Sequence, residues 1–475
     1  MFFGRTAKNT APSIEAQEGL SEASSEVLSE ELAPFTPILA YLKEVKIAYT
    51  VLSQKRLISF LEQENTLEIA AKVLQDNRGM LMVLMPAEYL LDYTLLAGVL
   101  KRELLPFTSQ DANPTYPLPD YYQLDAVIDE SLSHFSFYYF HLNGTDQYLC
   151  FKSEDFFSVH QKYILVKFTN SLEQIKNRTE TEDHESDLFS ALKMKGRLEE
   201  TFELPAIPTM TNAILKLRVD PKAEAKHLAA IVEKDPSLAA QVMSWAQSPY
   251  YGFSGTVTSV EMAIVKVLGF DLVMNLALGI AVGKSMKVPQ DGPLGLKKYW
   301  LSSIYTGALV EKLVYSMPAK LRPVRGLAYL AGLLCNFGHL LLGVVFPPQF
   351  YTLNKLILFN PHIHPSLIEK YLLGIDHEQI GSWLMKAWKM PPEVNAAVLN
   401  HHQENFEGEY VVYSNLVYLA NRLLKRHYLG DAESADISAR LLESLGLTDT
   451  QILCALEEVA SKGEEWSALS NQICS

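Results

Sequence analysis

Histidine and cysteine side chains in the C-terminal half of the sequence are the residues best suited to metal chemistry. His377 follows Asp376, His401 and His402 are adjacent, and Cys335 lies upstream of all three histidines. Imidazole and thiolate groups are suitable ligands for Zn²⁺, but the spacing of these residues does not by itself establish a site. The alternative, which we favour, is that the histidines are structural and form hydrogen bonds between helices.

A pair of tyrosines marks a second candidate site, which would serve binding. Tyr250 and Tyr251 lie in the segment SPYYGFSG (248–255), where a proline and two glycines interrupt the helical pattern. As a functional feature, the pair would form a recognition patch for a partner. As a structural feature, the two rings would close the corner between two helices, because aromatic side chains bury large apolar areas. We favour the structural interpretation.

Helices must position these residues, and the stretch 235–269 shows the helical pattern most clearly. Asp235 followed by Pro236 is typical of a helix start, because the carboxylate accepts from free N–H groups and proline has none to satisfy. Thr258 and Glu261 have the spacing of a capping box for a second helix. The apolar face of the first helix carries Leu238, Val242 and Trp245.

The sequence of this stretch closely resembles the HDOD domain. The resemblance rests on DPSLAAQVMSWAQSPYYG and on the S-x-x-x-A-I-x-x-L-G pattern from Ser259 to Gly269. The HDOD domain is an HD-related, all-helical output module of bacterial signalling proteins, usually without catalytic activity. The resemblance therefore implies an all-helical domain that works by binding.

HD-type phosphohydrolases hold metals with a His, a His-Asp pair and a distant Asp, and the resemblance locates the corresponding positions here. They are occupied by Ser302 after Trp300, by Cys335 and Asn336 in LAGLLCNFGHLLL, and by Asn421 in VYLANRLL. Without a carboxylate in this set, a hard metal such as Mg²⁺ has little to hold it. We therefore expect no catalytic metal and no cofactor. His377, His401 and His402 stand where related HD enzymes have histidines, and would line a residual pocket.

Residues 35–170 alternate between helical and strand patterns and predict a compact α/β domain. We expect a strand at 48–53, a helix running into a strand at 66–75, a buried strand at 80–86 and a helix at 88–104. Three further strands are expected from LDAVID, FSFYYFHL and YLCFKS, and Asn143-Gly144 is typical of a hairpin turn between the last two.

This region resembles the YbaK/prolyl-tRNA deacylase-like domain, which hydrolyses mischarged aminoacyl-tRNA. The resemblance is spread over ILAYLKEVKIAYTVLS, AAKVLQDNRGMLMVLMPAEYLLDYTLLAGVL and LDAVIDESL, and it gives Lys72 the position of the family's functional lysine. An ammonium group there can orient a carbonyl or stabilise charge developing at an ester. The sequence departs from the family at Asp111, where a pocket glycine is expected, with Tyr116 close by. We therefore favour a degenerate domain.

Composition sets broader limits on function. Hydrophobic residues make up 48% of the 475 residues, and the formal net charge is −14. This charge argues against broad binding to nucleic acid or to anionic membranes. The four cysteines are far apart in sequence and have no zinc-type spacing, which favours a reducing compartment. With neither a signal peptide nor an eighteen-residue apolar run, we expect a cytoplasmic protein that binds neither membrane nor DNA.

The sequence thus predicts a multidomain α/β plus all-α protein. The segments are a flexible tail (1–34), the YbaK-like domain (35–170), a charged linker (171–196), the HDOD domain (197–400) and a C-terminal helical extension (401–475), in which residues 429–475 carry two helices and a short tail. We expect a non-catalytic bacterial signalling protein that binds a protein partner, for example another signalling protein. The alternative is a deacylase that uses Lys72 on tRNA substrates, with the HDOD domain as its scaffold.

Overall fold

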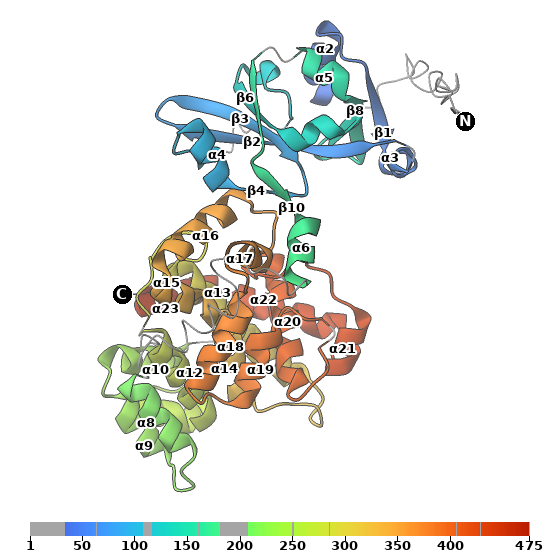
Figure 1. Cartoon of the computed structure of the whole chain (residues 1–475). Helices are drawn as coiled ribbons and strands as arrows, with labels where there is room; N and C mark the ends of the chain where they lie inside the picture. The colour runs from blue at the N-terminus through green and yellow to red at the C-terminus, as the bar shows by residue number, and fades with distance from the viewer. Residues whose placement is uncertain are drawn as a thin grey trace, which may run out of the picture. The chain divides into compact units, whose positions relative to one another are not determined.

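The structure is a computed structural model of the whole chain. It describes residues 34–62, 64–107, 116–159, 162–180, 208–248, 251–284, 286–404, 406–427 and 429–474. The chain divides into two compact units, Met1–Leu172 and Glu173–Ser475. The first is a mixed α/β unit and the second is helical (Figure 1).

An eight-stranded sheet organises the α/β unit. Its strands follow the order β1-β8-β7-β2-β3-β6-β9, and β5 pairs with β2 off this path. The bounds are β1 Tyr49–Ser53, β2 Thr66–Asp76, β3 Gly79–Pro86, β5 Leu105–Pro106, β6 Asp125–Asp129, β7 Phe137–His141, β8 Gln147–Lys152 and β9 Tyr163–Val166. A separate ribbon pairs β4 (Tyr89–Leu91) with β10 (Thr169–Ser171). The predicted hairpin is confirmed, because β7 and β8 pair antiparallel across Asn143-Gly144 and Gly144 has a φ of +87°.

Helices cover both faces of this sheet. Their bounds are α2 Thr36–Glu44, α3 Gln54–Leu61, α4 Tyr93–Leu100 and α5 Ser153–Val159, with 3₁₀ turns η2 Asp120–Tyr122 and η3 Glu130–His134. Helices α2 and α5 share one hydrophobic core with β2 and β3, and Figure 1 shows α4 on the other side of the sheet. Strand β3 is buried on both faces because Leu81 and Val83 alternate with Met82 and Leu84, all at most 2% exposed.

Two sequence predictions for this unit are wrong. Residues 66–75 form strand throughout, because β2 pairs with β7 at residues 66–68 and with β3 from Ile69 onward, and this pairing overrides the helix propensity of Leu, Glu and Ala. The single helix expected over 88–104 is instead β4 followed by α4. Asp92 separates the two elements by accepting hydrogen bonds from the backbone N–H groups of Thr94 and Leu95.

The second unit is built from helices throughout its described residues. The first part of the expected linker is helical, as α6 Leu172–Glu180. The next elements are α8 Thr209–Arg218, α9 Ala225–Val232, α10 Pro236–Gln247, α11 Val260–Met262, η5 Ala263–Leu268, α12 Phe270–Gly283, α13 Leu296–Ser316, α14 Arg325–Leu334, α15 Phe337–Val345 and α16 Pro347–Phe359. They are followed by α17 Pro365–Leu373, α18 His377–Ala387, α19 Pro392–Asn400, α20 Val411–Lys425, α21 Ala439–Leu445, α22 Asp449–Ala460 and α23 Gly463–Cys474.

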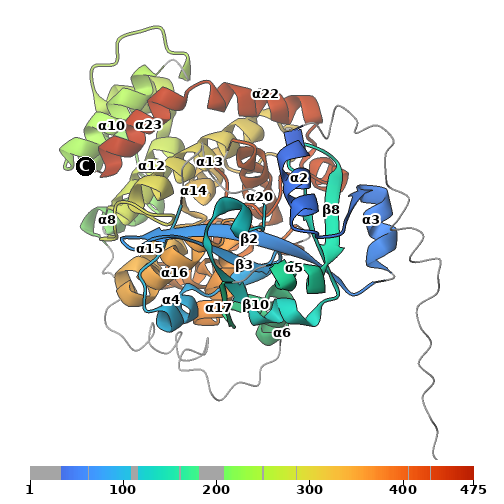
Figure 2. The same cartoon turned by 90° about the horizontal axis from the view of Figure 1, so that it is seen from above.

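Helix α13 forms the centre of this unit. It packs against α14, α20, α22 and α23, and Figure 2 shows α22 and α23 following one another near α13. Helix α18 packs between α15 and α19. The short tail expected at the C-terminus is wrong, because residues 463–474 form helix α23, in which Trp466 is buried and donates its indole N–H to Val459 O.

The start of α10 confirms the first predicted cap, and the start of α11 corrects the second. Asp235 accepts from the backbone N–H of Leu238 at 3.0 Å. For the next helix the cap is Ser259, one residue after Thr258, and its Oγ accepts from the N–H of Met262 at 3.1 Å. Residues 263–268 then widen into the π-helix η5, which Gly269 ends with a φ of +85°.

Among the described residues, no single helix is both long and apolar enough to cross a membrane. The bent pair α14 and α15 reaches that length and apolarity only when the two are taken together, with an angle of 42° between them. Most of the apolar side chains in both helices are buried.

Candidate functional site: a buried histidine cluster

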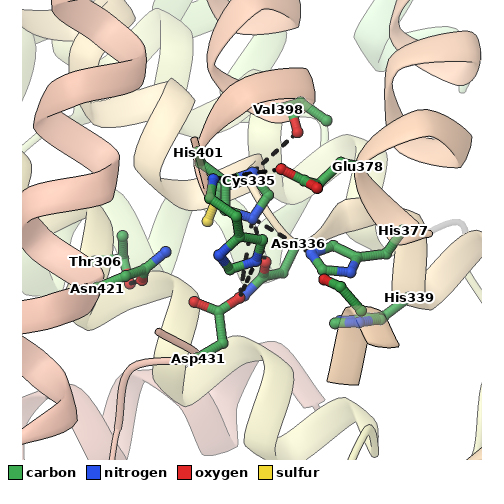
Figure 3. Close-up of polar contacts among 12 residues, drawn as sticks. Thr306, Cys335, Asn336, His339, His377, Glu378, Val398, His401, Asn421 and Asp431 are labelled. Carbon is green, nitrogen blue, oxygen red and sulfur yellow. Dashed lines mark hydrogen bonds and ion pairs between the residues drawn. The ribbon is translucent and has the colours of Figure 1, made fainter. Parts of the chain in front are cut away.

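Five histidines from four separate stretches of the sequence lie together in the helical unit. This histidine cluster consists of His339, His364, His377, His401 and His402. Helix ends position most of its members: His377 is the first residue of α18, His364 caps the start of α17, and His401 caps the end of α19. Figure 3 shows His377 and His401 turned toward each other, with Asp431 beside them.

Glu369 holds one side of the cluster from within the core. Its Oε1 lies 2.7 Å from His339 Nε2, and its Oε2 lies 2.9 Å from His377 Nδ1 and accepts the backbone N–H of His377 at 2.7 Å. Burial alone would raise the pKa of Glu369 and lower that of His377. The mutual attraction outweighs both effects, so that the pKa of Glu369 falls well below its usual range and that of His377 rises to about 9.

His401 is the centre of the cluster. Its Nδ1 lies 2.9 Å from Val398 O, and its Nε2 lies 3.3 Å from His377 Nε2 and 3.0 Å from Asn336 Oδ1. Burial and the neighbouring His402 lower the pKa of His401 well below its usual range. The ring is therefore neutral, and its contact with Val398 O requires the proton on Nδ1. The lone pair of Nε2 then points into the cluster.

Asp431 joins the cluster from the segment that follows α20. Its Oδ2 lies 3.4 Å from His402 Nε2 and 3.9 Å from His401 Nε2. Burial would raise the pKa of this carboxyl group, but the adjacent imidazoles of His402 and His401 hold it well below the usual range. Asp431 is therefore an anion inside the unit.

Two sets of side chains in this cluster have the geometry to bind a metal ion. The first is His377, His401, His402 and Asp431, and the second is His339, Glu369 and His377. In each set, one ligand atom per residue lies within 4.8 Å of the others. The three histidines expected to line a residual pocket are therefore brought together.

The four residues that the resemblance aligned with HD-type metal ligands form hydrogen bonds within the helical unit. Ser302 Oγ donates to Leu429 O at 2.8 Å, Cys335 Sγ donates to Gly332 O at 3.3 Å, and Asn421 Oδ1 accepts from Thr306 Oγ1 at 3.4 Å. Burial raises the pKa of the Cys335 thiol well above its usual value, which keeps it protonated. Asn336 alone touches the histidine cluster, through its contact with His401.

Two cavities adjoin the cluster. One, of about 300 Å³, is lined by His401 and His402 together with the basic residues Lys370 and Arg422. The other, of about 450 Å³, is lined by His339, His364 and Asp431 and by apolar side chains of α16. Asn421 lines the first cavity, and Ser302 and Asn336 line the second.

The tyrosine pair is only partly described by the structure. Tyr250 lies outside the described residues, whereas Tyr251 is half-buried and its hydroxyl is among the groups that interact with the buried Glu311. The nearby Trp245 is 5% exposed, as expected for a core residue of α10.

Lys72, the candidate residue of the α/β unit, lies in the middle of β2 opposite Val83. Its side chain is half-buried, and burial lowers the pKa of its ammonium group to about 8. A cavity at the end of β2, lined by residues 75–78 and by Arg102, does not include Lys72. Asp111 lies outside the described residues, and Tyr116 packs against the hydrophobic core.

Sequence reasoning missed four members of the site, namely His339, His364, Glu369 and Asp431. They lie on three different elements and are separated by up to 92 residues, and nothing in their local sequence indicates that they meet. His339 lies within the LAGLLCNFGHLLL run, but only the fold brings its ring to Glu369.

Comparison with known proteins gives matches to the helical unit and to nearly the whole chain. The sequence pattern of the HDOD domain matches residues 204–404. A structure from Marinobacter aquaeolei VT8, of a protein whose name proposes a role in signal transduction, is 31% identical. It covers 93% of this chain and 99% of that chain, with a TM-score of 0.77.

Two further relatives match shorter parts of the chain. An HDOD domain protein of unknown function from Geobacter sulfurreducens is 22% identical and covers 59% of this chain and 96% of that chain, with a TM-score of 0.48. An uncharacterized protein from Treponema pallidum (strain Nichols) is 22% identical over 227 residues, which are 47% of this chain. The chain spans only 42% of the length of that protein.

Proposed function

We propose that this chain, which belongs to the HDOD family through residues 204–404, is a non-catalytic signalling protein. It would work by binding a protein partner. The match to the Marinobacter protein, over nearly the full length of both chains, supports a role in signalling. Binding rather than catalysis is our own inference, and it rests on the chemistry of the site.

The proposal rests on one observation: the side chains at the HD-type ligand positions are not metal ligands but are engaged in the interior of the protein. Hydrolysis by HD enzymes needs metals that activate water and polarise a phosphoryl oxygen. Here Ser302 and Asn421 form hydrogen bonds within the protein, and Cys335 is a buried thiol. None of these three side chains supplies a carboxylate or a free imidazole, so the hydrolytic pair of metals has no primary ligands at these positions.

An exposed apolar surface lies beside the end of η5, and we propose that the partner binds there. Tyr315 and Val324 are 50% and 51% exposed. Arg325 joins them to the corner, because its guanidinium lies over the Tyr315 ring and donates to Leu268 O at the end of η5. Exposed apolar and aromatic side chains around an arginine are typical of protein interfaces.

The proposal is tested by capturing the partner with the full-length chain. We expect the wild-type protein to enrich a specific protein from a lysate of its own organism, and the Tyr315→Ser/Val324→Ser variant to lose it without a change in thermal stability. Tyr351→Ser is the matched control, because Tyr351 is a 63% exposed tyrosine on α16. Equal recovery with the wild type and the double variant would contradict a binding role for this surface.

The deacylase remains a second candidate function, and one observation favours it. Burial lowers the pKa of Lys72 to about 8, which still leaves most of the side chain as an ammonium near pH 7, and shifted pKa values are common at functional sites. If this reading holds, the purified chain hydrolyses a mischarged aminoacyl-tRNA and Lys72→Met abolishes the reaction. Equal hydrolysis rates for the wild type and Lys72→Met would contradict a deacylase that uses Lys72.

A further inference from the structure

Four side chains of the helical unit bring potential ligand atoms close together. His377 Nε2 lies 3.3 Å from His401 Nε2, and Asp431 Oδ2 lies 3.4 Å from His402 Nε2. All four residues offer ligand atoms within 4.8 Å of one another. We propose that His377, His401, His402 and Asp431, here called the metal quartet, bind a single divalent transition-metal ion of the zinc class.

The first argument concerns the direction of the lone pairs. His377 Nδ1 is paired with the carboxylate of Glu369 and His401 Nδ1 with the carbonyl of Val398, each at 2.9 Å. Both Nδ1 atoms therefore carry protons that they donate outward. The lone pair of the neutral His401 ring is then on Nε2, and it faces His377 Nε2, which carries either a proton or, on a neutral ring, a second lone pair. Such a contact needs a positive charge between them, either a metal ion or a shared proton.

The second argument concerns polar atoms that lack partners. Within the described part of the chain, His402 Nε2 and both carboxylate oxygens of Asp431 are buried without a short hydrogen bond, and their one polar contact is the 3.4 Å ion pair between His402 Nε2 and Asp431 Oδ2. Buried groups of this kind are costly to leave unsatisfied. A shared proton between His377 and His401 leaves Asp431 Oδ1 without a partner and His402 Nε2 paired only with Asp431 Oδ2 at 3.4 Å, whereas a metal ion would bind all four residues. This is what favours the metal over the proton.

The chemistry of the ligands selects the class of metal. Three imidazoles and one carboxylate suit Zn²⁺ and neighbouring transition metals, whereas Mg²⁺ and Ca²⁺ prefer oxygen ligands. Bonds of about 2.0–2.1 Å in a tetrahedral zinc site place the ligand atoms about 3.3–3.4 Å apart. Two of the separations in the quartet match this spacing, and Asp431 Oδ2 lies 3.9 Å from His401 Nε2.

The surroundings of the quartet resemble those of known metal sites. Metal-binding histidines commonly donate their second ring N–H to a carboxylate or a backbone carbonyl, which fixes the orientation of the ring. Glu369 and Val398 have these two roles here. The quartet contains none of the four HD-type positions. The inference therefore revises the expectation that no metal binds, but the ligands of the hydrolytic metals are still missing. Such an ion would link the start of α18, the end of α19 and the segment after α20.

The test is metal binding by the full-length chain, purified without a histidine tag and stripped with a chelator. We expect one equivalent of Zn²⁺ to bind and to raise the melting temperature. We expect one equivalent of Co²⁺ to give the strong visible absorption of a tetrahedral site. Asp431→Asn and His402→Gln each remove one ligand and should weaken Zn²⁺ binding by more than about 100-fold, since loss of outer partners alone costs 10–100-fold.

Asp436→Asn is the matched control, because it changes an exposed aspartate in the same segment and should bind Zn²⁺ as the wild type does. The proposal is overturned if the wild type binds neither ion, or if Asp431→Asn and His402→Gln bind as tightly as it does. If both variants fail to fold, the stoichiometry and the Co²⁺ spectrum of the wild type still decide. Capture of a partner needs no metal, so the two proposals fail separately.

Discussion

Glu311 is a buried charge that lies apart from the histidine cluster. Its side chain is 1% exposed on α13, and Arg325 Nε approaches it at 3.4 Å. Burial raises the pKa of this carboxyl group to about 7, against the weaker opposing effects of Arg325 and Lys312. Near neutral pH the folded protein therefore holds a carboxylate at an energetic cost, beside the corner formed by residues 235–269.

This cost predicts how stability changes with pH. The pKa of Glu311 is higher in the folded state, about 7, than its ordinary value of 4.5, so the folded state binds the proton more tightly and loses stability as pH rises between these values. Glu311→Gln removes the charge. The substitution changes the free energy of unfolding relative to the wild type. We expect this change to be more stabilising at pH 8 than at pH 4.5 by about 2–3 kcal/mol. Urea unfolding of both proteins at the two pH values measures this, and parallel pH profiles would contradict it.

At the residue scale, the sequence identified part of the site. It predicted that His377, His401 and His402 belong together, because they occupy positions recognised by family resemblance. It could not predict Asp431 as their neighbour, since this residue reaches the cluster only through the path of the chain after α20. The suggested ligand Cys335 is absent from both candidate metal sets.

At the scale of elements, α10 shows how local signals and packing combine. The Asp235 cap and Pro236 start the helix, and Leu238, Val242 and Trp245 are buried along it. The Trp245 indole N–H is buried without a hydrogen-bond partner among the described residues. Trp245 therefore contributes through its volume and apolar area.

Replacing this side chain should destabilise the helical unit. Trp245→Ala leaves a cavity and should lower the free energy of unfolding by about 3–5 kcal/mol. Trp245→Phe keeps much of the volume and loses no hydrogen bond, so it should cost well under half as much. Denaturant unfolding followed by circular dichroism gives both values. A loss of less than 1 kcal/mol in the alanine variant would mean that this helix does not depend on its tryptophan.

Predictions at this scale succeeded where local chemistry decides and failed where tertiary pairing decides. The Asn143-Gly144 turn and the Asp235 cap are set by backbone and side-chain geometry within a few residues. Residues 66–75 have good helix formers, but pairing with β3 makes them strand. The π-helix at 263–268 has no simple sequence signal, and it packs against α10 and α12.

At the scale of the whole molecule, the chain combines a mixed α/β unit with a helical HDOD unit. The change from mixed to helical patterns was visible in the sequence because the apolar periodicity changes between the two regions. The YbaK-like identity of the first unit and its tRNA substrate stay predictions, as do the protein partner, the cytoplasmic location and the residue limits of the five segments.

Phosphodiester hydrolysis by the purified full-length chain is the most direct test of the claim that the HDOD unit binds rather than catalyses. The assay supplies Mg²⁺, Mn²⁺, Fe²⁺ or Zn²⁺ with a chromogenic phosphodiester and with cyclic dinucleotides, and an active HD phosphohydrolase serves as the positive control. Because Ser302, Cys335, Asn336 and Asn421 replace the ligands of the hydrolytic metals, we predict no turnover above the protein-free reaction with any ion. Metal-dependent turnover by the wild type that disappears in Asp431→Asn would contradict this prediction and make the histidine cluster an active site.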